Sequence, residues 1–360
     1  MKRLFSFLTM CLITAGSLFS QNNMTTKFFD GKDLAILGKA FDTPHLYGRL
    51  PAHLEGKIRE QLWYLGRNSA GIALRFSSNT TAVTLKWSVL NNFSMNHMPA
   101  TGIKGLDLYV NEGDGWNYAG TAKPVGKSSE AVVIKNMERR VREYLIYLPL
   151  YDGAEKIEVG VDNDSDFNPK PENLMFSREK RVIFYGTSIT QGGCASRPGM
   201  AYPSIFSRLS GVETINLGFS GNGRLDLEIA KEICRADFDV LFMDCLPNCT
   251  AQIVRDSAEL FIKTIREQKP TAKIVLVENP KFPYLVLDKK TFSELDEENR
   301  EWKALYLKLK KSDKHIYYIP GDKILGDDSE TTVDGVHYTD LGFMRAANEL
   351  YKHYKKIVKN

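Results

Sequence analysis

The feature that most constrains the fold of this chain is a regular alternation in its C-terminal half. From Arg181 onward, five short apolar runs of strand length alternate with amphipathic stretches of helix length. The predicted strands are 181–186, 213–218, 238–244, 273–278 and 315–319, and the predicted helices are 202–209, 225–235, 251–268, 293–311 and 339–358. Since consecutive parallel strands need a crossover between them, this pattern predicts a five-stranded parallel sheet with helices on both faces.

The preceding segment, residues 24–165, has a different periodicity. Residues 81–89 alternate apolar and polar side chains with a period of two, which is typical of a half-buried strand. Further strand-like runs occupy 105–111, 142–150 and 156–161. Short strands at this spacing predict an antiparallel, jelly-roll-like β-sandwich. The polar, proline-bearing stretch 166–180 is interpreted as a linker to the α/β domain at 181–358.

Three acidic residues at the end of the predicted sandwich raise the question of a calcium site. Asp162, Asp164 and Asp166 have the spacing that opens a calcium-binding loop. However, Phe167 stands where such a loop needs glycine, and Asn173 stands where it needs the closing glutamate. A solvated loop is therefore the preferred interpretation.

The N-terminus has the pattern of a secretory signal. Lys2 and Arg3 precede a nearly uncharged apolar stretch at 4–19, which is too short to span a bilayer comfortably. We predict that residues 1–20 are a signal peptide and that cleavage occurs near Ser20. The mature chain is then expected to be exported, periplasmic or extracellular, and to have no integral membrane segment.

Charge and cysteine content exclude several classes of protein. The chain has 48 Lys and Arg against 44 Asp and Glu, a formal charge of +4, which indicates no nucleic-acid partner. No two cysteines form a CxxC pair, so a structural zinc site is not expected. The sequence leaves open how the cysteines of the mature chain pair; they are Cys194, Cys234, Cys245 and Cys249.

Residues that can act in catalysis or ligand binding follow the carboxyl ends of the predicted parallel strands, which is where sites form in such sheets. Ser188 follows the first strand, Gly218 the second and Asn248 the third. Asp334 lies three residues before His337, just ahead of the last helix. Each of these alone is also explained as a turn former, a helix cap or a surface residue. Together they supply the nucleophile, base, orienting acid and oxyanion donors that acyl transfer needs.

These strand-end motifs make residues 181–358 resemble an SGNH (GDSL-type) hydrolase. The run Gly105–Tyr109 (GLDLY) resembles the GxDLY signature of a β-domain that precedes some of these enzymes. The resemblance implies a three-layer, flavodoxin-like catalytic domain. Two motifs depart from the family pattern: Thr187 replaces the acid before the serine, and the run ending at Asn248 lacks the glycine and following acid of GxND.

The resemblance also implies a role for each strand-end residue. Ser188 would be the nucleophile, His337 the general base and Asp334 the acid that orients it. The oxyanion hole would consist of the backbone N–H groups of Ser188 and Gly218 and the side-chain amide of Asn248. No metal or organic cofactor is implied.

The expected activity is hydrolysis of carboxylic esters, with acetylated carbohydrate or another small ester as substrate. A short-chain lysophospholipase or thioesterase and a non-catalytic glycan-binding protein that retains the fold are the alternatives. The loop Asn91–Met98 carries apolar side chains, and we expect it to pack between the domains rather than reach over the active site. The sequence does not indicate an oligomeric state.

Overall fold

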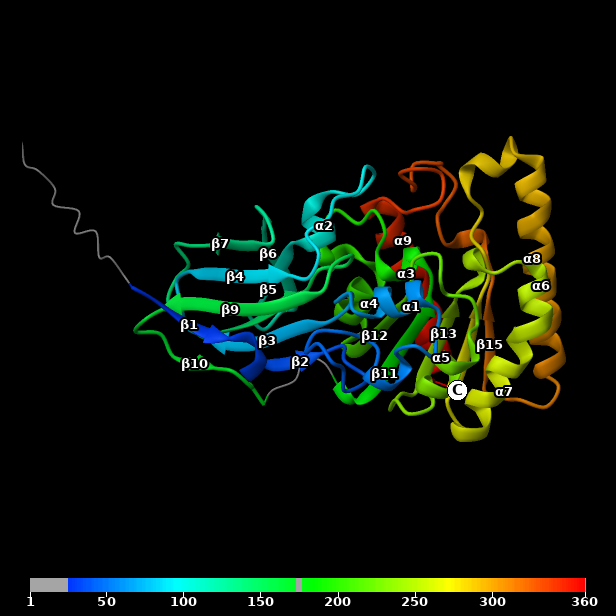
Figure 1. Ribbon diagram of the computed structural model, residues 1–360, viewed down its shortest axis with the longest axis horizontal. Helices are drawn as coiled ribbons and strands as arrows, with labels where there is room; N and C mark the ends of the chain where they lie inside the picture. Colours follow the sequence, from blue (N-terminus) through cyan, green and yellow to red (C-terminus); the bar gives the residue numbers. More distant parts are fainter. Residues whose placement is uncertain (1–24, 173–176, 360) are drawn as a thin grey trace, which may run out of the picture.

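The computed structural model describes residues 25–172 and 177–359, which form two adjoining parts (Figure 1). A β-sandwich lies on the left of the view, and a helix-covered sheet lies on the right. The predicted signal peptide, residues 1–20, lies outside the described residues. Within the described part of the chain, no helix combines the length and apolar character needed to cross a membrane.

Two antiparallel sheets form the sandwich, which confirms the fold class predicted for the N-terminal half. The first has the order β1 (Thr26–Asp30), β9 (Ala154–Asp162), β4 (Val83–Val89) and β7 (Ser128–Ile134). The second has the order β10 (Phe167–Asn168), β3 (Ala73–Ser78), β8 (Arg142–Tyr147), β5 (Leu106–Asn111) and β6 (Trp116–Ala122), and β2 (Ala35–Leu37) also pairs with β3. Alternate residues such as Leu74, Phe76 and Leu85 fill the core between the sheets.

Two short helices interrupt the N-terminal half, and the periodicity does not predict them. They are α1 (Glu60–Gly66) and α2 (Ala100–Lys104), with 3₁₀ turns at Gly31–Asp33 and Ala52–Leu54. Leu62 and Leu65 of α1 are buried in the core of the α/β part and not in the sandwich. A segment of the predicted β-domain therefore completes the core of the other domain.

The C-terminal part is a five-stranded parallel sheet, as predicted. Its order is β12 (Val212–Gly218), β11 (Ser177–Gly186), β13 (Val240–Asp244), β14 (Lys273–Val277) and β15 (Ile316–Ile319). The second strand in sequence thus lies outside the first, which is the flavodoxin-like order. The helices are α3 (Ser188–Gln191), α4 (Tyr202–Ser210), α5 (Leu227–Ile233), α6 (Ala251–Ile253), α7 (Glu259–Gln268), α8 (Lys289–Leu309) and α9 (Asp340–Ile357). A π-helical turn at Val254–Ala258 joins α6 to α7, where one helix was predicted.

The central strands are buried on both faces, because alternate side chains enter two different cores. Ile183 and Tyr185 of β11 face a core that includes α5 and α7. Val182 and Phe184 face the opposite core, which includes α4 and α9. This three-layer arrangement leaves the carboxyl ends of the strands as the edge where a site can form.

The predicted linker, residues 166–180, takes part in strand pairing at both of its ends. Phe167 and Asn168 pair with β3, and β11 begins at Ser177, earlier than the predicted Arg181. Ser177 pairs with Val212 before a register shift leads to Arg181. β10 has only two residues and the pairing of Ser177 is separated from Arg181 by a register shift, so neither segment is long enough to show the period of a strand.

The GLDLY motif joins the two domains. The carboxylate of Asp107, whose side chain is 0% exposed, accepts hydrogen bonds from Arg197 and from the backbone N–H of Gly199, each at 2.8 Å. The hydroxyl of Tyr109 lies 2.7 Å from the same guanidinium. Because Arg197 and Gly199 lie in the segment after α3, this buried cluster holds the sandwich against the strand edge that bears Ser188.

Candidate active site

Ser188 is the first residue of α3, and one residue, Thr187, separates it from the end of β11. Thr187 is the N-cap, and its side chain accepts from the N–H of Ile189 while Thr190 bonds back to the Thr187 N–H. This capping box fixes the sharp turn from strand to helix. Ser188 is 7% exposed, and among the described residues its own N–H has no hydrogen-bond partner. That N–H is therefore free to bind an anionic oxygen.

His337 and Asp334 lie on the loop before α9 and reach Ser188 as the sequence predicted. The Nε2 atom of His337 is 2.9 Å from the Ser188 Oγ atom, and its Nδ1 atom is 2.7 Å from Asp334 Oδ2. Asp334 Oδ1 accepts from the backbone N–H groups of Val336 and His337, at 3.0 and 2.8 Å. The structure thus joins all three side chains in one hydrogen-bonded chain.

Electrostatics keep Asp334 ionised. Partial burial acts to raise the pKa of Asp334, but the hydrogen bonds from the His337 ring and from two backbone N–H groups outweigh it and hold this pKa below its ordinary value. An ionised carboxylate beside Nδ1 favours the tautomer that carries its proton there. Nε2 is then left to accept a proton from Ser188.

Gly218 lies at the end of β12, but its N–H is already engaged. It donates to the side-chain oxygen of Asn216 at 2.9 Å, and the Gly218 carbonyl accepts from buried Arg49 at 2.7 Å. A Cβ at this position would lie 2.2 Å from the backbone nitrogen of Gln191. The geometry therefore explains Gly218 by close packing against α3, and the hydrogen bonding does not support the predicted oxyanion role.

Asn248 lies on the predicted edge, at the end of the 3₁₀ turn Leu246–Asn248 that follows β13. Its side-chain oxygen accepts from the N–H of Gly223 at 3.3 Å. Gly223 in turn packs on the end of β11, since a Cβ there would lie 2.2 Å from the Gly186 carbonyl oxygen. Asn248 is thus held close to the nucleophile turn, with its NH₂ group as the remaining donor.

Beneath the nucleophile turn lies a buried carboxyl group that the sequence reading did not single out. Asp244, the last residue of β13, accepts from the hydroxyl of Tyr202 at 2.8 Å and from that of Thr190 at 3.4 Å. Burial raises the pKa of Asp244 to about 7, although these two hydrogen bonds act in the opposite direction. Thr190 also belongs to the capping box, so Asp244 supports the turn that presents Ser188.

The raised pKa of Asp244 predicts that the stability of the fold depends on pH. The folded pKa lies above the ordinary 3.8, so between 3.8 and about 7 the native state holds a proton that the unfolded state releases. The stabilisation is present below that range and is lost as pH rises through it. The difference in unfolding free energy between the wild type and Asp244→Asn should therefore shrink as pH increases, measured by urea unfolding. Exposed Asp237→Asn is the control, and a pH-independent difference for Asp244→Asn would contradict the assignment.

Two residues that the sequence analysis did not connect with the site lie beside His337 and Asp334. The ring centroid of His97 is 5.6 Å from that of His337. Cys194 is buried after α3, and burial together with the nearby Asp334 raises the pKa of its thiol to about 12. The thiol therefore stays protonated and is a poor nucleophile. Because His97 and Cys194 lie far from His337 in the sequence, no local pattern predicted that they would be close to it.

His97 belongs to the loop Asn91–Met98, whose placement the sequence predicted in part. Met98 is buried in a core of the α/β domain, and Phe93 and Met95 pack against that core. The loop therefore does pack between the domains. The same loop also brings His97 next to His337, with 5.6 Å between the ring centroids.

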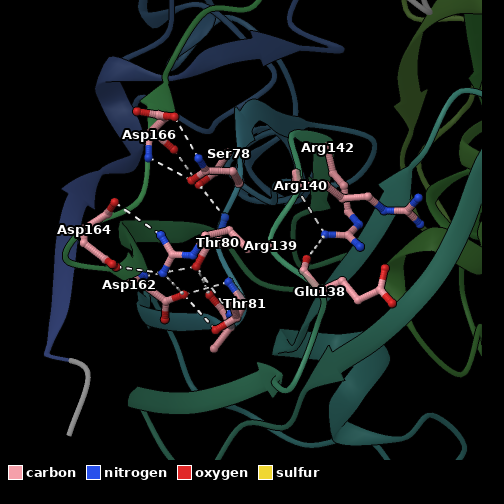
Figure 2. Close-up of polar contacts among 12 residues, drawn as sticks. Ser78, Thr80, Thr81, Glu138, Arg139, Arg140, Arg142, Asp162, Asp164 and Asp166 are labelled. Carbon is pink, nitrogen blue, oxygen red and sulfur yellow. Dashed lines mark hydrogen bonds and ion pairs between the residues drawn. The ribbon is translucent and has the colours of Figure 1, made fainter. Parts of the chain in front are cut away.

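The acidic loop at the end of the sandwich binds protein groups (Figure 2). Asp162 accepts from the backbone N–H and hydroxyl of Thr81, and the guanidinium of Arg139 lies 2.8 Å from Asp164 and 3.7 Å from Asp162. Asp166 bonds to the side chain of Asn79. Because a cationic side chain lies between two of the carboxylates, the structure favours an ordered loop over a calcium site.

Comparison with protein families matches both parts of the chain. Residues 179–357 match the model of the GDSL-like lipase/acylhydrolase family. Residues 26–167 match the model of the GxDLY domain, described as the N-terminus of SGNH-hydrolase-type esterases. A search of the curated proteins gave no match.

Solved structures share the whole architecture. A Bacteroides ovatus protein described as a GDSL-like lipase is 34% identical, with a TM-score of 0.88, over 93% of this chain and 98% of that one. A salicylyl-acyltransferase from a tetracycline biosynthetic pathway is 17% identical, with a TM-score of 0.74, over 92% and 97%. A family two carbohydrate esterase from Clostridium thermocellum, in complex with cellohexaose, is 12% identical, with a TM-score of 0.57, over 81% and 93%. The last two likenesses show a shared fold.

Proposed function

Because the chain belongs to the GDSL-like lipase/acylhydrolase family and is a hydrolase of carboxylic esters, we propose that Ser188, His337 and Asp334 are its catalytic triad. The observation that carries this proposal is the continuous hydrogen-bonded chain from Ser188 Oγ through both ring nitrogens of His337 to Asp334. Nucleophile, base and orienting acid are each within hydrogen-bond distance of the next.

The proposed reaction follows from this geometry. His337 Nε2 takes the proton of Ser188 as the serine oxygen attacks the ester carbonyl, and Asp334 stabilises the imidazolium that forms. The carbon–oxygen bond to the alcohol then breaks, and the alcohol leaves with the proton from His337. Water attacks the resulting acyl-serine, giving its proton to His337, and the acid is released as the serine is reprotonated.

The negative charge of the tetrahedral intermediate needs preorganised donors. We propose the N–H of Ser188 and the side-chain NH₂ of Asn248, each typically worth about 2.7–4 kcal/mol of barrier lowering. For the remaining donor, Gly221 is a better candidate than Gly218, because its N–H has no partner among the described residues. Gly221 has a φ of 67° in the turn before Gly223, the residue that packs against the end of β11.

The proposed substrate is an acetylated carbohydrate, and the proposed location is outside the cytoplasm. Support for the substrate comes from the carbohydrate esterases that share the two-domain fold, and support for export comes from the pattern of residues 1–20. A lysophospholipase or thioesterase would use the same triad with a longer acyl group. A glycan-binding protein would use the same fold without turnover.

Hydrolysis of p-nitrophenyl esters from acetate to octanoate, together with acetate release from acetylated xylo-oligosaccharides, tests the substrate class. We expect kcat/KM for acetate to exceed that for octanoate by at least about tenfold, because misplaced methylene groups in a small pocket cost roughly that much. Preference for long chains would favour the lysophospholipase or thioesterase. Binding of oligosaccharides without turnover of any ester would favour the glycan-binding protein.

A further inference from the structure

Four side chains with metal-binding atoms lie close together in the proposed active site. They are His97, Cys194, Asp334 and His337, and one ligand atom from each lies within 4.8 Å of all the others. The two domains both contribute: His97 belongs to the loop after β4, Cys194 follows α3, and the other two precede α9. Of these four residues, the proposed triad uses only Asp334 and His337, so its chemistry does not account for the positions of His97 and Cys194.

This donor set has the chemistry of a zinc site. Imidazole nitrogen, thiolate sulfur and carboxylate oxygen are the ligands that Zn²⁺ prefers, and four-coordinate tetrahedral sites are its commonest geometry. Bond lengths of about 2.0–2.3 Å place the ligand atoms of such a site about 3.3–3.8 Å apart. The four side chains would therefore need to converge by roughly 1 Å. Asp334 is exposed and His97 is partly exposed, so both can move and the ion can enter from solvent.

The hydrogen bond at His97 supports this assignment. His97 Nδ1 lies 2.8 Å from the side-chain oxygen of Asn96, which favours a proton on Nδ1 and a lone pair on Nε2. Histidines that bind metals typically donate their other ring N–H to such an oxygen, which fixes the tautomer. Asn96 thus orients His97 so that its Nε2 atom can act as a ligand.

We propose that Zn²⁺ binds His97, Cys194, Asp334 and His337 and reversibly inhibits the enzyme. Binding forms a metal–sulfur bond and releases the thiol proton of Cys194 to solvent, because coordination deprotonates a thiol. If His337 binds Zn²⁺ through Nε2, the lone pair that would accept the Ser188 proton is no longer available. If it binds through Nδ1, the hydrogen bond between His337 and Asp334 is broken. The inhibition rests on the proposed triad, whereas the binding of metal does not.

Metal binding is tested on the full chain carrying Ser188→Ala, which separates it from catalysis. Calorimetric titration with Zn²⁺ should show one site, and Co²⁺ should give the near-ultraviolet absorption of a thiolate–metal bond. Adding Cys194→Ser should abolish that absorption. Adding His97→Ala should lower the affinity for Zn²⁺ at least about tenfold, because even residues that only hydrogen-bond to a metal ligand change metal affinity by about 10–100-fold. Cys234→Ser and His45→Ala are the matched controls and should change neither result.

Inhibition is tested on the active enzyme, with each variant compared with its own metal-free rate. Zn²⁺ should inhibit ester hydrolysis, a chelator should restore it, and His97→Ala or Cys194→Ser should raise the inhibition constant at least about tenfold. No saturable binding to the Ser188→Ala chain would overturn the proposal, as would binding unaffected by both cluster variants. If the chain bound Zn²⁺ through these residues but hydrolysed no ester, the proposed function would be contradicted and the metal site would still be supported.

Discussion

Replacement of Ser188 with alanine is expected to lower kcat for ester hydrolysis by roughly 10⁴–10⁶-fold. The hydroxyl is the proposed nucleophile, and its hydrogen-bond partner in the structure is the general base, His337 Nε2. No other hydroxyl among the described residues contacts that nitrogen. The measurement is the initial rate on p-nitrophenyl acetate, beside a fluorophosphonate probe that labels an activated serine.

The fold should survive this change, because among the residues that the structure describes the Ser188 hydroxyl hydrogen-bonds only to His337. Thermal unfolding should therefore be nearly unchanged, which separates loss of chemistry from loss of structure. Ser312→Ala, at an exposed serine after α8, is the control and should keep both the activity and the probe labelling. Wild-type turnover by Ser188→Ala would exclude the proposed mechanism.

The second largest effect is expected from Asp334→Asn, which should reduce kcat by roughly 10³–10⁴-fold. An asparagine oxygen can still accept the backbone N–H groups of Val336 and His337, so the loop keeps its shape. Its NH₂ group, however, would face His337 Nδ1 and favour the tautomer with the proton on Nε2. That nitrogen could then no longer accept the proton of Ser188.

The measurement is kcat on the acetate ester, with the unfolding transition recorded in parallel. Asp328→Asn is a matched control, because this carboxylate also precedes α9 in the chain but pairs with Arg345. It should leave kcat almost unchanged. If Asp334→Asn retained wild-type turnover, His337 would have to be oriented by another group.

Local periodicity was enough to predict both fold classes. The apolar runs of β11 to β15 and the amphipathic helices between them carry their signal within a few residues, and alternation does the same for β4. A strand of only one or two paired residues shows no such period. Phe167 and Ser177 therefore joined strands from within a predicted linker, although the ring of Phe167 stacks on Phe29 and Phe76 of the sandwich.

The contact between Ser188 and His337 could be predicted because the topology is simple. Parallel strands with right-handed crossovers place every strand end on the same edge, so Ser188 and His337 meet although 149 residues separate them. Hydrogen-bond donors cannot be assigned in this way. The side chain of Asn216 accepts the hydrogen bond of the Gly218 N–H, so that N–H is not available to a ligand near Ser188.

By itself, the sequence determined the five parallel strands of the α/β domain, their order along the chain and which residues stand at their ends, because these follow from local patterns and from the rules of chain connection. Only the tertiary structure decided how the two domains meet. It placed α1 in the core of the α/β part, closed the GLDLY motif on Arg197 and brought His97 to His337. Such contacts depend on the complementary packing of two surfaces distant in the chain, and no short stretch of sequence encodes that complementarity.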